Sequence, residues 1–235
     1  MRVVRGSVNA PEPDRAVTVR LVQSVAAAGE SVLRVWQPPE QVAFGRRDAN
    51  REGFERARDA VTSGGVSAIE RSTGGHAVYF TGNTVSFVRA TPVSDERTGI
   101  ERRYEETIPK VQTALSAVGV ETHRGEPEGA FCPGTHSLSA DGKIVGLAQR
   151  VRNDVAVVAG ILVLQDHEQI AALLDPVYDA LDIPFNPDAV GSVARAGGTA
   201  RWPAIRDALE AELASGEPKL EPAAASLDGA SNVEN

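Results

Sequence analysis

The spacing of hydrophobic residues changes from segment to segment along the chain, and this spacing predicts the secondary structure. Segments that alternate apolar and polar residues, or that are rich in Val, Ile and aromatic residues, are typical of β-strands. Such segments lie at 16–22, 32–37, 41–44, 67–71, 77–80 and 84–89. Residues 49–62 instead place Phe54, Ala57 and Val61 on one face, which predicts a helix.

The clearest helical pattern covers residues 98–118. Its apolar residues recur at spacings of three and four, so they form one stripe, and Gly119 follows as a helix stop. Pro109 lies inside the stripe, so a kink or a break into two helices is an open alternative. Two further helices are predicted at 166–174 and 199–214.

A second group of strands is predicted in the C-terminal half. Residues 135–140 and 143–150 flank Asp141-Gly142, a dipeptide typical of tight hairpins. Residues 155–164 contain a continuous apolar run, which is typical of a strand buried on both faces. Strands and helices that do not alternate regularly as βαβ units predict one α+β domain.

The two ends of the chain differ in composition from the middle. We predict an N-terminal extension over residues 1–15, the domain over 16–215, and a disordered tail over 216–235, which is small, polar and Pro-containing. We expect no signal peptide, and the longest apolar run is too short to span a bilayer. A cytoplasmic protein with no membrane partner is therefore the expectation.

Charge and cysteine content narrow the possible functions. The 235 residues include 24 Lys and Arg against 32 Asp and Glu, a net charge of −8, and the only lysines are Lys110, Lys143 and Lys219. This balance argues against nucleic-acid binding, which needs clustered positive charge, so no nucleic-acid partner is expected. The single cysteine, Cys132, excludes an internal disulfide, and the four histidines lack metal-site spacing, so no metal site is expected.

The first segment with candidate chemistry follows a predicted strand. It reads Glu70-Arg71-Ser72-Thr73-Gly74-Gly75-His76-Ala77-Val78-Tyr79, and Gly82-Asn83-Thr84 comes soon after. The arginine supplies a fixed cation, and the glycines let backbone N–H groups approach a ligand closely, which suits a phosphate or a carboxylate. A hairpin turn that requires positive φ is the alternative explanation of the glycines.

The second segment, residues 134–150, centres on a lysine. Lys143 opens a strand directly after a tight turn, and the small residues Gly146 and Ala148 alternate on one face of it, leaving room for a ligand. A lysine at this place reaches a carbonyl or phosphate oxygen as a point charge. The alternative is a solvated lysine at a hairpin.

Together, the two segments resemble the lipoate–protein ligase A branch of the biotin/lipoate protein ligase superfamily. The resemblance covers roughly residues 16–214 and rests on the order and spacing of both segments. The matching residues are Arg71, Thr73, Gly74, Gly75, Ala77, Val78, Gly82, Asn83, Gly142, Lys143, Gly146, Ala148 and Gln149. The resemblance implies a mixed β-sheet flanked by helices. It also implies a ligase that activates lipoate with ATP as lipoyl-adenylate and passes it to a lysine of an acceptor domain.

The resemblance also implies roles for individual residues. Lys143 would contact the carbonyl and phosphate oxygens of the adenylate, and Asn83 would orient the loop or the substrate. The residues expected to bind the acyl-adenylate are Arg71, Ser72, Thr73, Gly74, Gly75, His76, Ala77, Gly146, Ala148 and Gln149. The implied cofactor is ATP as its magnesium complex, with lipoate as substrate. The implied partners are lipoyl acceptor domains of 2-oxoacid dehydrogenase complexes or the glycine cleavage H protein.

Some residues depart from the pattern of that family. His76 replaces the third glycine of the loop, and Val158-Ala159-Gly160 stands where a His-Gly pair is common. We expect no counterpart of the additional C-terminal domain of the larger ligases, in which case a separate accessory-domain protein would supply it. A non-catalytic lipoate-binding protein is therefore one alternative.

Cys132 suggests another alternative. It precedes the Lys143 hairpin, and this lysine segment resembles that of the cysteine-dependent octanoyltransferases, whose loop cysteine stands a few residues further upstream. Those enzymes take octanoate from acyl carrier protein through a thioester and without ATP. This chemistry needs a thiolate, whose pKa a nearby cation such as Lys143 lowers. Packing of a small buried thiol is the simpler explanation of a lone cysteine.

Overall fold

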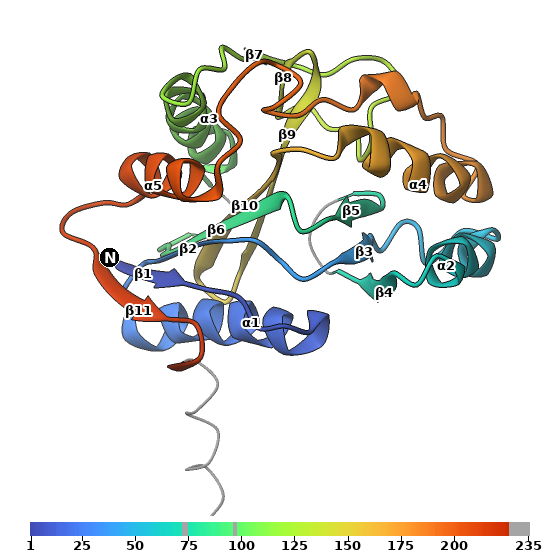
Figure 1. Ribbon diagram of the computed structural model, residues 1–235. Helices are drawn as coiled ribbons and strands as arrows, with labels where there is room; N and C mark the ends of the chain where they lie inside the picture. Colours follow the sequence, from blue (N-terminus) through green and yellow to red (C-terminus); the bar gives the residue numbers. More distant parts are fainter. Residues whose placement is uncertain (72–74, 96–97, 226–235) are drawn as a thin grey trace, which may run out of the picture.

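The computed structural model describes residues 1–71, 75–95 and 98–225, which form an eight-stranded sheet and a smaller one (Figure 1). The large sheet has the order β11-β1-β2-β6-β10-β9-β8-β7. Its strands are β1 (Arg2–Arg5), β2 (Val32–Trp36), β6 (Thr84–Pro92), β7 (His123–Arg124), β8 (Ser137–Ala140), β9 (Gly142–Arg152), β10 (Val155–Val163) and β11 (Lys219–Pro222). Since β1 is parallel to β2 and β11 while the other neighbours are antiparallel, the sheet is mixed.

The smaller sheet has the order β4-β3-β5. In its middle, β3 (Gln41–Phe44) runs parallel to β4 (Ser67–Glu70) and antiparallel to β5 (Val78–Phe80). The chain that joins β4 to β5 must therefore cross the end of β3, just where Gly45 follows that strand. Gly75 and His76, the described residues of the glycine-rich segment that the sequence singles out, belong to this connection, and Gly75 lies beside Gly45.

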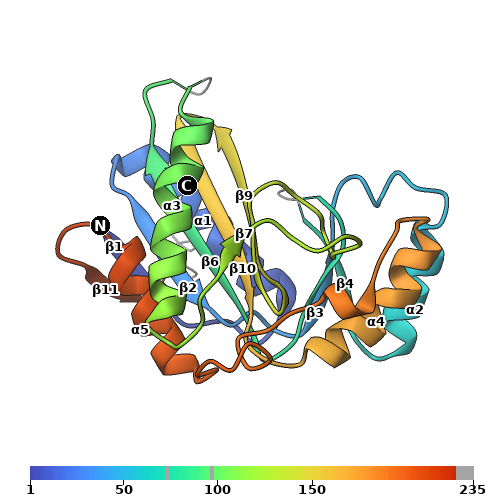
Figure 2. The same ribbon diagram turned by 90° about the horizontal axis from the view of Figure 1, so that it is seen from above.

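The helices cover both faces of the large sheet. α1 (Pro11–Ala28) packs on one face, while α3 (Ile100–Ser116) and α5 (Trp202–Leu213) pack on the other (Figure 1). α2 (Phe54–Ser63) and α4 (His167–Ala180) pack together beside the small sheet, and the short 3-10 helix η1 (Pro187–Ala189) follows (Figure 2). This arrangement confirms the predicted α+β fold with a mixed sheet flanked by helices.

α3 confirms the predicted helical stripe. Its residues Tyr104, Ile108, Val111 and Leu115 are buried against the large sheet. The helix continues through Pro109, which lies on the exposed side. A proline there removes one hydrogen bond but does not disturb the packed face.

The strand predicted over residues 16–22 is wrong, because this segment belongs to α1. The buried apolar residues are Val17, Leu21 and Val25, whose spacing of four places them on one side of a helix. Small apolar and polar residues alternate locally in the predicted segment, which imitates a strand over a short window. Because Val17, Leu21 and Val25 are all buried on the side of α1 that packs against β6 and β10, the segment is a helix instead.

Both ends of the chain enter the large sheet, which differs from the predicted extension and tail. β1 and the first turn of α1 lie within residues 1–15, and β11 lies within residues 216–235. Segments of four residues are too short to show a period in the sequence, so both strands escape prediction. Val3 and Val4 have no exposed surface and face different hydrophobic clusters, so β1 contributes to the core on both faces.

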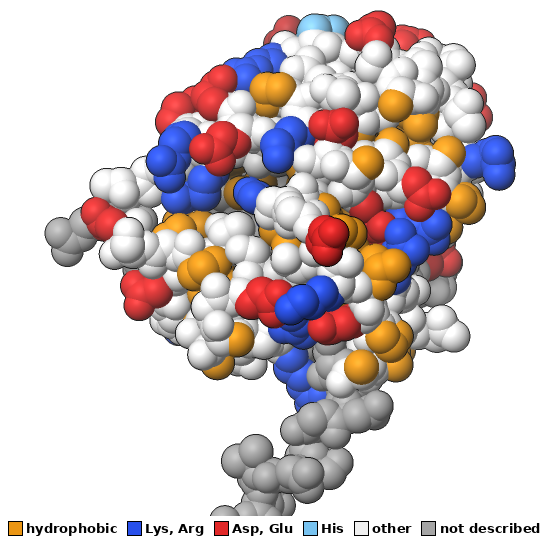
Figure 3. Space-filling model, turned by 90° about the vertical axis from the view of Figure 1, so that its left-hand side faces the viewer, with side chains coloured by type: hydrophobic (Ala, Val, Ile, Leu, Met, Phe, Trp, Pro, Cys, Tyr) orange, Lys and Arg blue, Asp and Glu red, His pale blue; other side chains and the backbone are white. Residues whose placement is uncertain are grey.

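The edge beside β11 is held by ion pairs. Arg2 contacts Glu221 at 3.0 Å, and Arg5 is paired with Glu210 of α5. Basic and acidic side chains are intermixed over this side of the molecule (Figure 3). Among the described residues, no helix is long and apolar enough to cross a membrane.

Candidate active site

A cavity of about 650 Å³ lies between the large sheet, the small sheet and α1. The pairing of β9 with β10 builds its floor, because Gly146 stands opposite Ile161 and Ala148 stands opposite Ala159. These small residues leave free space over one face of the sheet. The walls are mostly apolar and include Trp36, Ala43, Ile69, Val78 and Phe80. Such a lining suits an extended apolar chain.

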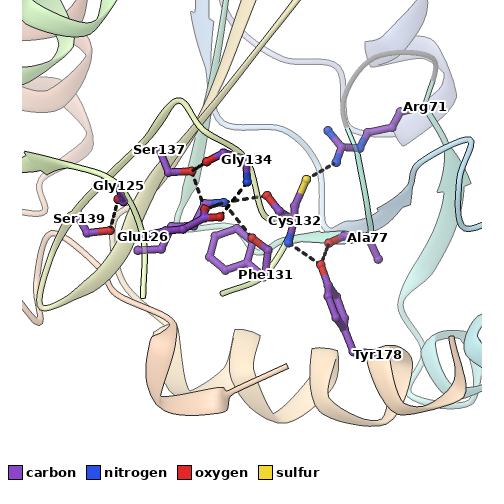
Figure 4. A network of polar contacts seen from close by, with 11 residues as sticks. Arg71, Ala77, Gly125, Glu126, Phe131, Cys132, Gly134, Ser137, Ser139 and Tyr178 are labelled. Atoms are coloured by element: carbon purple, nitrogen blue, oxygen red, sulfur yellow. Dashed lines mark hydrogen bonds and ion pairs between the residues drawn. The ribbon is translucent and has the colours of Figure 1, made fainter. Parts of the chain in front are cut away.

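Cys132 lines this cavity and lies within a network of polar contacts (Figure 4). Arg71, which directly follows β4, donates from Nη2 to Cys132 Sγ at 3.3 Å and to the carbonyl oxygen of His76 at 2.6 Å. Cys132 has a φ of 41°, a left-handed conformation that non-glycine residues seldom adopt without support. The loop that carries this cysteine is therefore held by its surroundings.

Tyr178 supplies part of that support from α4. Its Oη accepts the Cys132 backbone N–H at 2.6 Å and donates to the carbonyl oxygen of Ala77 at 2.9 Å. Burial, together with the neighbouring thiol of Cys132, raises the pKa of Tyr178 well above its ordinary value, so the phenol keeps its proton. One hydroxyl therefore links the loop that carries Cys132 to Ala77, which directly precedes β5.

Lys143 supports the same loop from β9. Its Nζ donates to the carbonyl oxygens of Phe131 at 2.9 Å and Cys132 at 2.7 Å, and pairs with Glu126 at 2.7 Å. Glu126 also accepts from Ser137 Oγ and from the Gly134 backbone N–H. The three N–H donors of a lysine are thus engaged, and its side chain is only 1% exposed.

The environment of Cys132 favours the thiolate. Burial of the thiol raises its pKa, but the positive charges of Arg71 and Lys143 and the backbone N–H groups of His76 and Gly75 lower it. The balance leaves the pKa of Cys132 below the ordinary thiol value. A cysteine with these neighbours is suited to nucleophilic chemistry.

We expect iodoacetamide to alkylate Cys132 with a pH midpoint below the ordinary thiol value of about 8.5. The rate rises as pH increases through the midpoint, because only the thiolate reacts. Arg71→Gln removes the charge 3.3 Å from Sγ, so its midpoint should move upward. Since the sequence has one cysteine, alkylation followed by mass spectrometry reports on this site alone. A wild-type midpoint at or above the ordinary value would contradict the lowered pKa.

The cavity brings together most of the predicted site residues that the structure describes. Those that line it are Arg71, Gly75, Cys132, Lys143, Gly146 and Ala148. Ala77 borders them through its hydrogen bond with Tyr178. The predicted residues Ser72, Thr73 and Gly74 lie outside the described residues.

Three predicted residues have other partners. Gln149 accepts from Arg103 Nε at 2.8 Å and donates to the Ile100 carbonyl, so it faces α3, on the sheet face opposite Ala148. Asn83 donates to Asp166 at 2.8 Å and so links the turn after β5 to the start of α4. His76 Nδ1 pairs with Asp48 Oδ1 at 2.7 Å.

Sequence reasoning missed Glu126, Tyr178 and Asp48. Tyr178 occupies an apolar position of α4 beside Leu174 and Val177, where an aromatic residue predicts only core packing. Glu126 and Asp48 lie in segments between regular elements, where acidic residues are common on protein surfaces. Their pairing with Lys143 and His76 is visible only once the chain is folded.

Comparison with known proteins decides the family. A family model described as the lipoyl protein ligase A/B catalytic domain matches residues 11–212. The chain belongs to this family. The resemblance to lipoate–protein ligases carried by the two sequence segments is thereby confirmed.

Curated relatives in the lipoyl protein ligase A/B family include acyltransferases. The octanoyl-[GcvH]:protein N-octanoyltransferase of Geobacillus kaustophilus is 29% identical over 134 residues, 56% of this chain and 47% of that protein. The enzyme of the same name from Anoxybacillus flavithermus is 30% identical over 162 residues, 68% of this chain and 58% of that protein. The chain spans about half the length of the curated relatives it matches.

Solved structures show the same fold at low identity. Lipoate-protein ligase A bound with ATP superposes with a TM-score of 0.77 and 16% identity, covering 97% of this chain and 92% of that one. The structure of a bi-partite lipoate protein ligase and its E2 lipoyl domain from Thermoplasma acidophilum gives a TM-score of 0.69 at 14% identity, covering 97% and 90%. These similarities support the lipoyl protein ligase A/B fold.

Proposed function

We propose that the protein transfers an octanoyl or lipoyl group to a lysine of an acceptor domain through a thioester at Cys132, without ATP. The observation that carries this proposal is the Cys132 thiol in the lining of a mostly apolar cavity, 3.3 Å from Arg71, with its pKa lowered. The named activity of the curated relatives, transfer of octanoyl groups between GcvH and other proteins, supports the same reaction class.

The reaction proceeds in two acyl transfers. The Cys132 thiolate attacks the acyl carbonyl of the donor, a C–S bond forms, and the bond from the carbonyl carbon to the donor's nitrogen or sulfur breaks as that atom takes up a proton. The acceptor lysine, as a neutral amine, then attacks the thioester. A C–N bond forms, the C–S bond breaks, the nitrogen loses a proton, and the thiolate returns.

In the proposed reaction, each part of the acyl group occupies a different part of the cavity. The carbonyl end lies at Cys132, where Arg71 and the Gly75 and His76 amides stabilise negative charge on the tetrahedral adduct. The hydrocarbon chain lies along the floor formed by Gly146, Ala148 and Ala159. Lys143 and Tyr178 keep the cysteine loop in its left-handed conformation.

The ATP-dependent ligase is the competing function, and it places a different demand on Lys143. For Lys143 to contact an adenylate, Nζ must give up at least one of its bonds to Glu126, Phe131 and Cys132. The transferase needs no such exchange, because Lys143 lowers the pKa of Cys132 from where it lies. This difference favours the transferase.

A transfer assay with separate donors tests the proposal. The purified protein and a lipoyl domain of a 2-oxoacid dehydrogenase are incubated with one of three donors. These are octanoylated glycine cleavage H protein (octanoyl-H protein), octanoylated acyl carrier protein, or free lipoate with ATP and magnesium. A mass increase of the lipoyl domain with either acylated protein supports the transferase. Transfer only with ATP and lipoate, in the presence or absence of an accessory-domain protein, overturns it in favour of the ligase. Lipoate binding without any product identifies a binding protein instead.

A further inference from the structure

We propose that His76 and Asp48 form a positioning pair that holds the Gly75-His76 segment against Cys132 Sγ. Its role in acyl transfer rests on the proposed function. Neither side chain is placed in contact with the reacting atoms. The pair acts through Arg71 and through the backbone N–H groups of Gly75 and His76.

Asp48 is a fixed anchor. It has no exposed surface, and its Oδ2 accepts the Gly45 backbone N–H at 2.9 Å while its own N–H donates to the Gly45 carbonyl at 3.0 Å. Both bonds lie within the turn that follows β3. The remaining carboxylate oxygen, Oδ1, is directed to His76 Nδ1 at 2.7 Å. A buried carboxylate with a hydrogen-bond partner at each of its two oxygens keeps one orientation.

The turn that follows β3 and the segment that precedes β5 contact each other closely at Gly45 and Gly75. A Cβ on Gly45 would lie 1.7 Å from the carbonyl oxygen of Gly75, so glycine is required where the crossing segment passes over the end of β3. The His76 side chain is 12% exposed. The contact between Gly45 and Gly75 and the pair between Asp48 and His76 therefore join the same two loops at neighbouring positions.

The main chain of His76 faces the cysteine. Its carbonyl oxygen accepts from Arg71 Nη2 at 2.6 Å, and the same nitrogen donates to Cys132 Sγ at 3.3 Å. The backbone N–H groups of His76 and Gly75 lower the pKa of the thiol. His76 is thus tied to Asp48 through its side chain and to the Cys132 environment through its backbone. A glycine at this position would lack the side-chain anchor.

Two substitutions of His76 separate hydrogen bonding from bulk. His76→Asn places an amide N–H close to the position of Nδ1, so it keeps a donor for Asp48, whereas His76→Leu keeps comparable bulk without a donor. His167→Ala is the matched control. His167 lies at the start of α4, and its Nδ1 makes a comparable contact, with Ser192 Oγ at 3.2 Å. Because this contact does not involve Asp48, Gly75 or His76, we expect His167→Ala to leave the Gly75-His76 segment in place.

The readout is the pH profile of Cys132 alkylation, together with kcat and KM for octanoyl transfer. For His76→Leu we expect the alkylation midpoint to move upward, the rate at pH 7 to fall about 3- to 10-fold, and kcat to fall more than KM changes. His76→Asn and His167→Ala should behave like the wild type. Thermal unfolding checks that each variant is folded, and Asp48→Asn, which should resemble His76→Leu, serves if His76→Leu does not fold.

Two results would contradict the proposed positioning role of His76 and Asp48. One is an alkylation profile of His76→Leu that matches the wild type, and the other is an equal change in His76→Asn and His76→Leu. Alkylation needs no acyl donor, so the pair is tested even if Cys132 never forms an acyl adduct. An octanoyl adduct combined with unchanged alkylation in His76→Leu would reject the pair while leaving the proposed function intact.

Discussion

Cys132→Ser is expected to abolish the covalent octanoyl adduct and to lower octanoyl transfer by about 10³-fold or more, because a serine hydroxyl is not ionised near neutral pH. The cavity, Arg71 and Lys143 remain in this variant, so substrate binding should persist. Intact-protein mass spectrometry after brief mixing with octanoyl-H protein detects the adduct in the wild type. The acceptor lipoyl domain reports transfer in the same samples.

Cys132→Ala is the companion variant, since it removes the sulfur without adding a hydroxyl group. Both variants should lose the adduct and the transfer together. If Cys132→Ser transfers lipoate at the wild-type rate when ATP is supplied, the thioester is not an intermediate and the ligase explains the site. Lipoate binding to Cys132→Ala, measured by calorimetry, shows that the cavity is still formed.

Lys143→Met is expected to lower both activity and stability. The substitution leaves Glu126, whose side chain is 16% exposed, without its cation, and removes the donor from the carbonyl oxygens of Phe131 and Cys132. Removing one partner of a buried ion pair costs about 3 kcal/mol. The Cys132 loop loses a support, and the thiol loses a charge that lowers its pKa. Denaturant unfolding measures the stability, and the transfer assay measures the activity.

Two further variants show whether the lysine acts on the cysteine or only on folding. Lys143→Met combined with Glu126→Gln removes the unpaired carboxylate, so it should regain part of the lost stability but little of the activity. Lys219→Met is the matched control on β11, where the side chain is 72% exposed, and it should change neither. Wild-type transfer by Lys143→Met would contradict the assigned place of Lys143.

The two sequence segments predict the centre of the site because their spacing already implies its geometry. Gly146 and Ala148 are two residues apart on one strand, so they share a face whatever the rest of the fold does. The same rule places Gln149 on the opposite face, and the structure shows it against Arg103 and Ile100. The resemblance assigned Gln149 to the ligand without regard to this alternation.

The partners that support the site could not be predicted in the same way. Tyr178 lies 46 residues from Cys132 and Asp48 lies 28 residues from His76, so their contacts depend on the packing of α4 and on the crossing of β3. Periodicity describes only neighbours along one element. The error over residues 16–22 has a similar origin, because the burial of α1 is set by strands that are distant in the sequence.

The pairing of β11 with β1 has a consequence for any shortened version of the protein. β1 carries Val3 and Val4 and, without β11, would become an edge strand with unpaired backbone N–H and C=O groups. An exposed apolar edge strand promotes aggregation by strand addition, whereas β11 carries Lys219, Glu221 and Pro222, residue types that disfavour such pairing. Truncation after residue 215 is therefore expected to make the protein self-associate, although it leaves every residue of the Cys132 site in place.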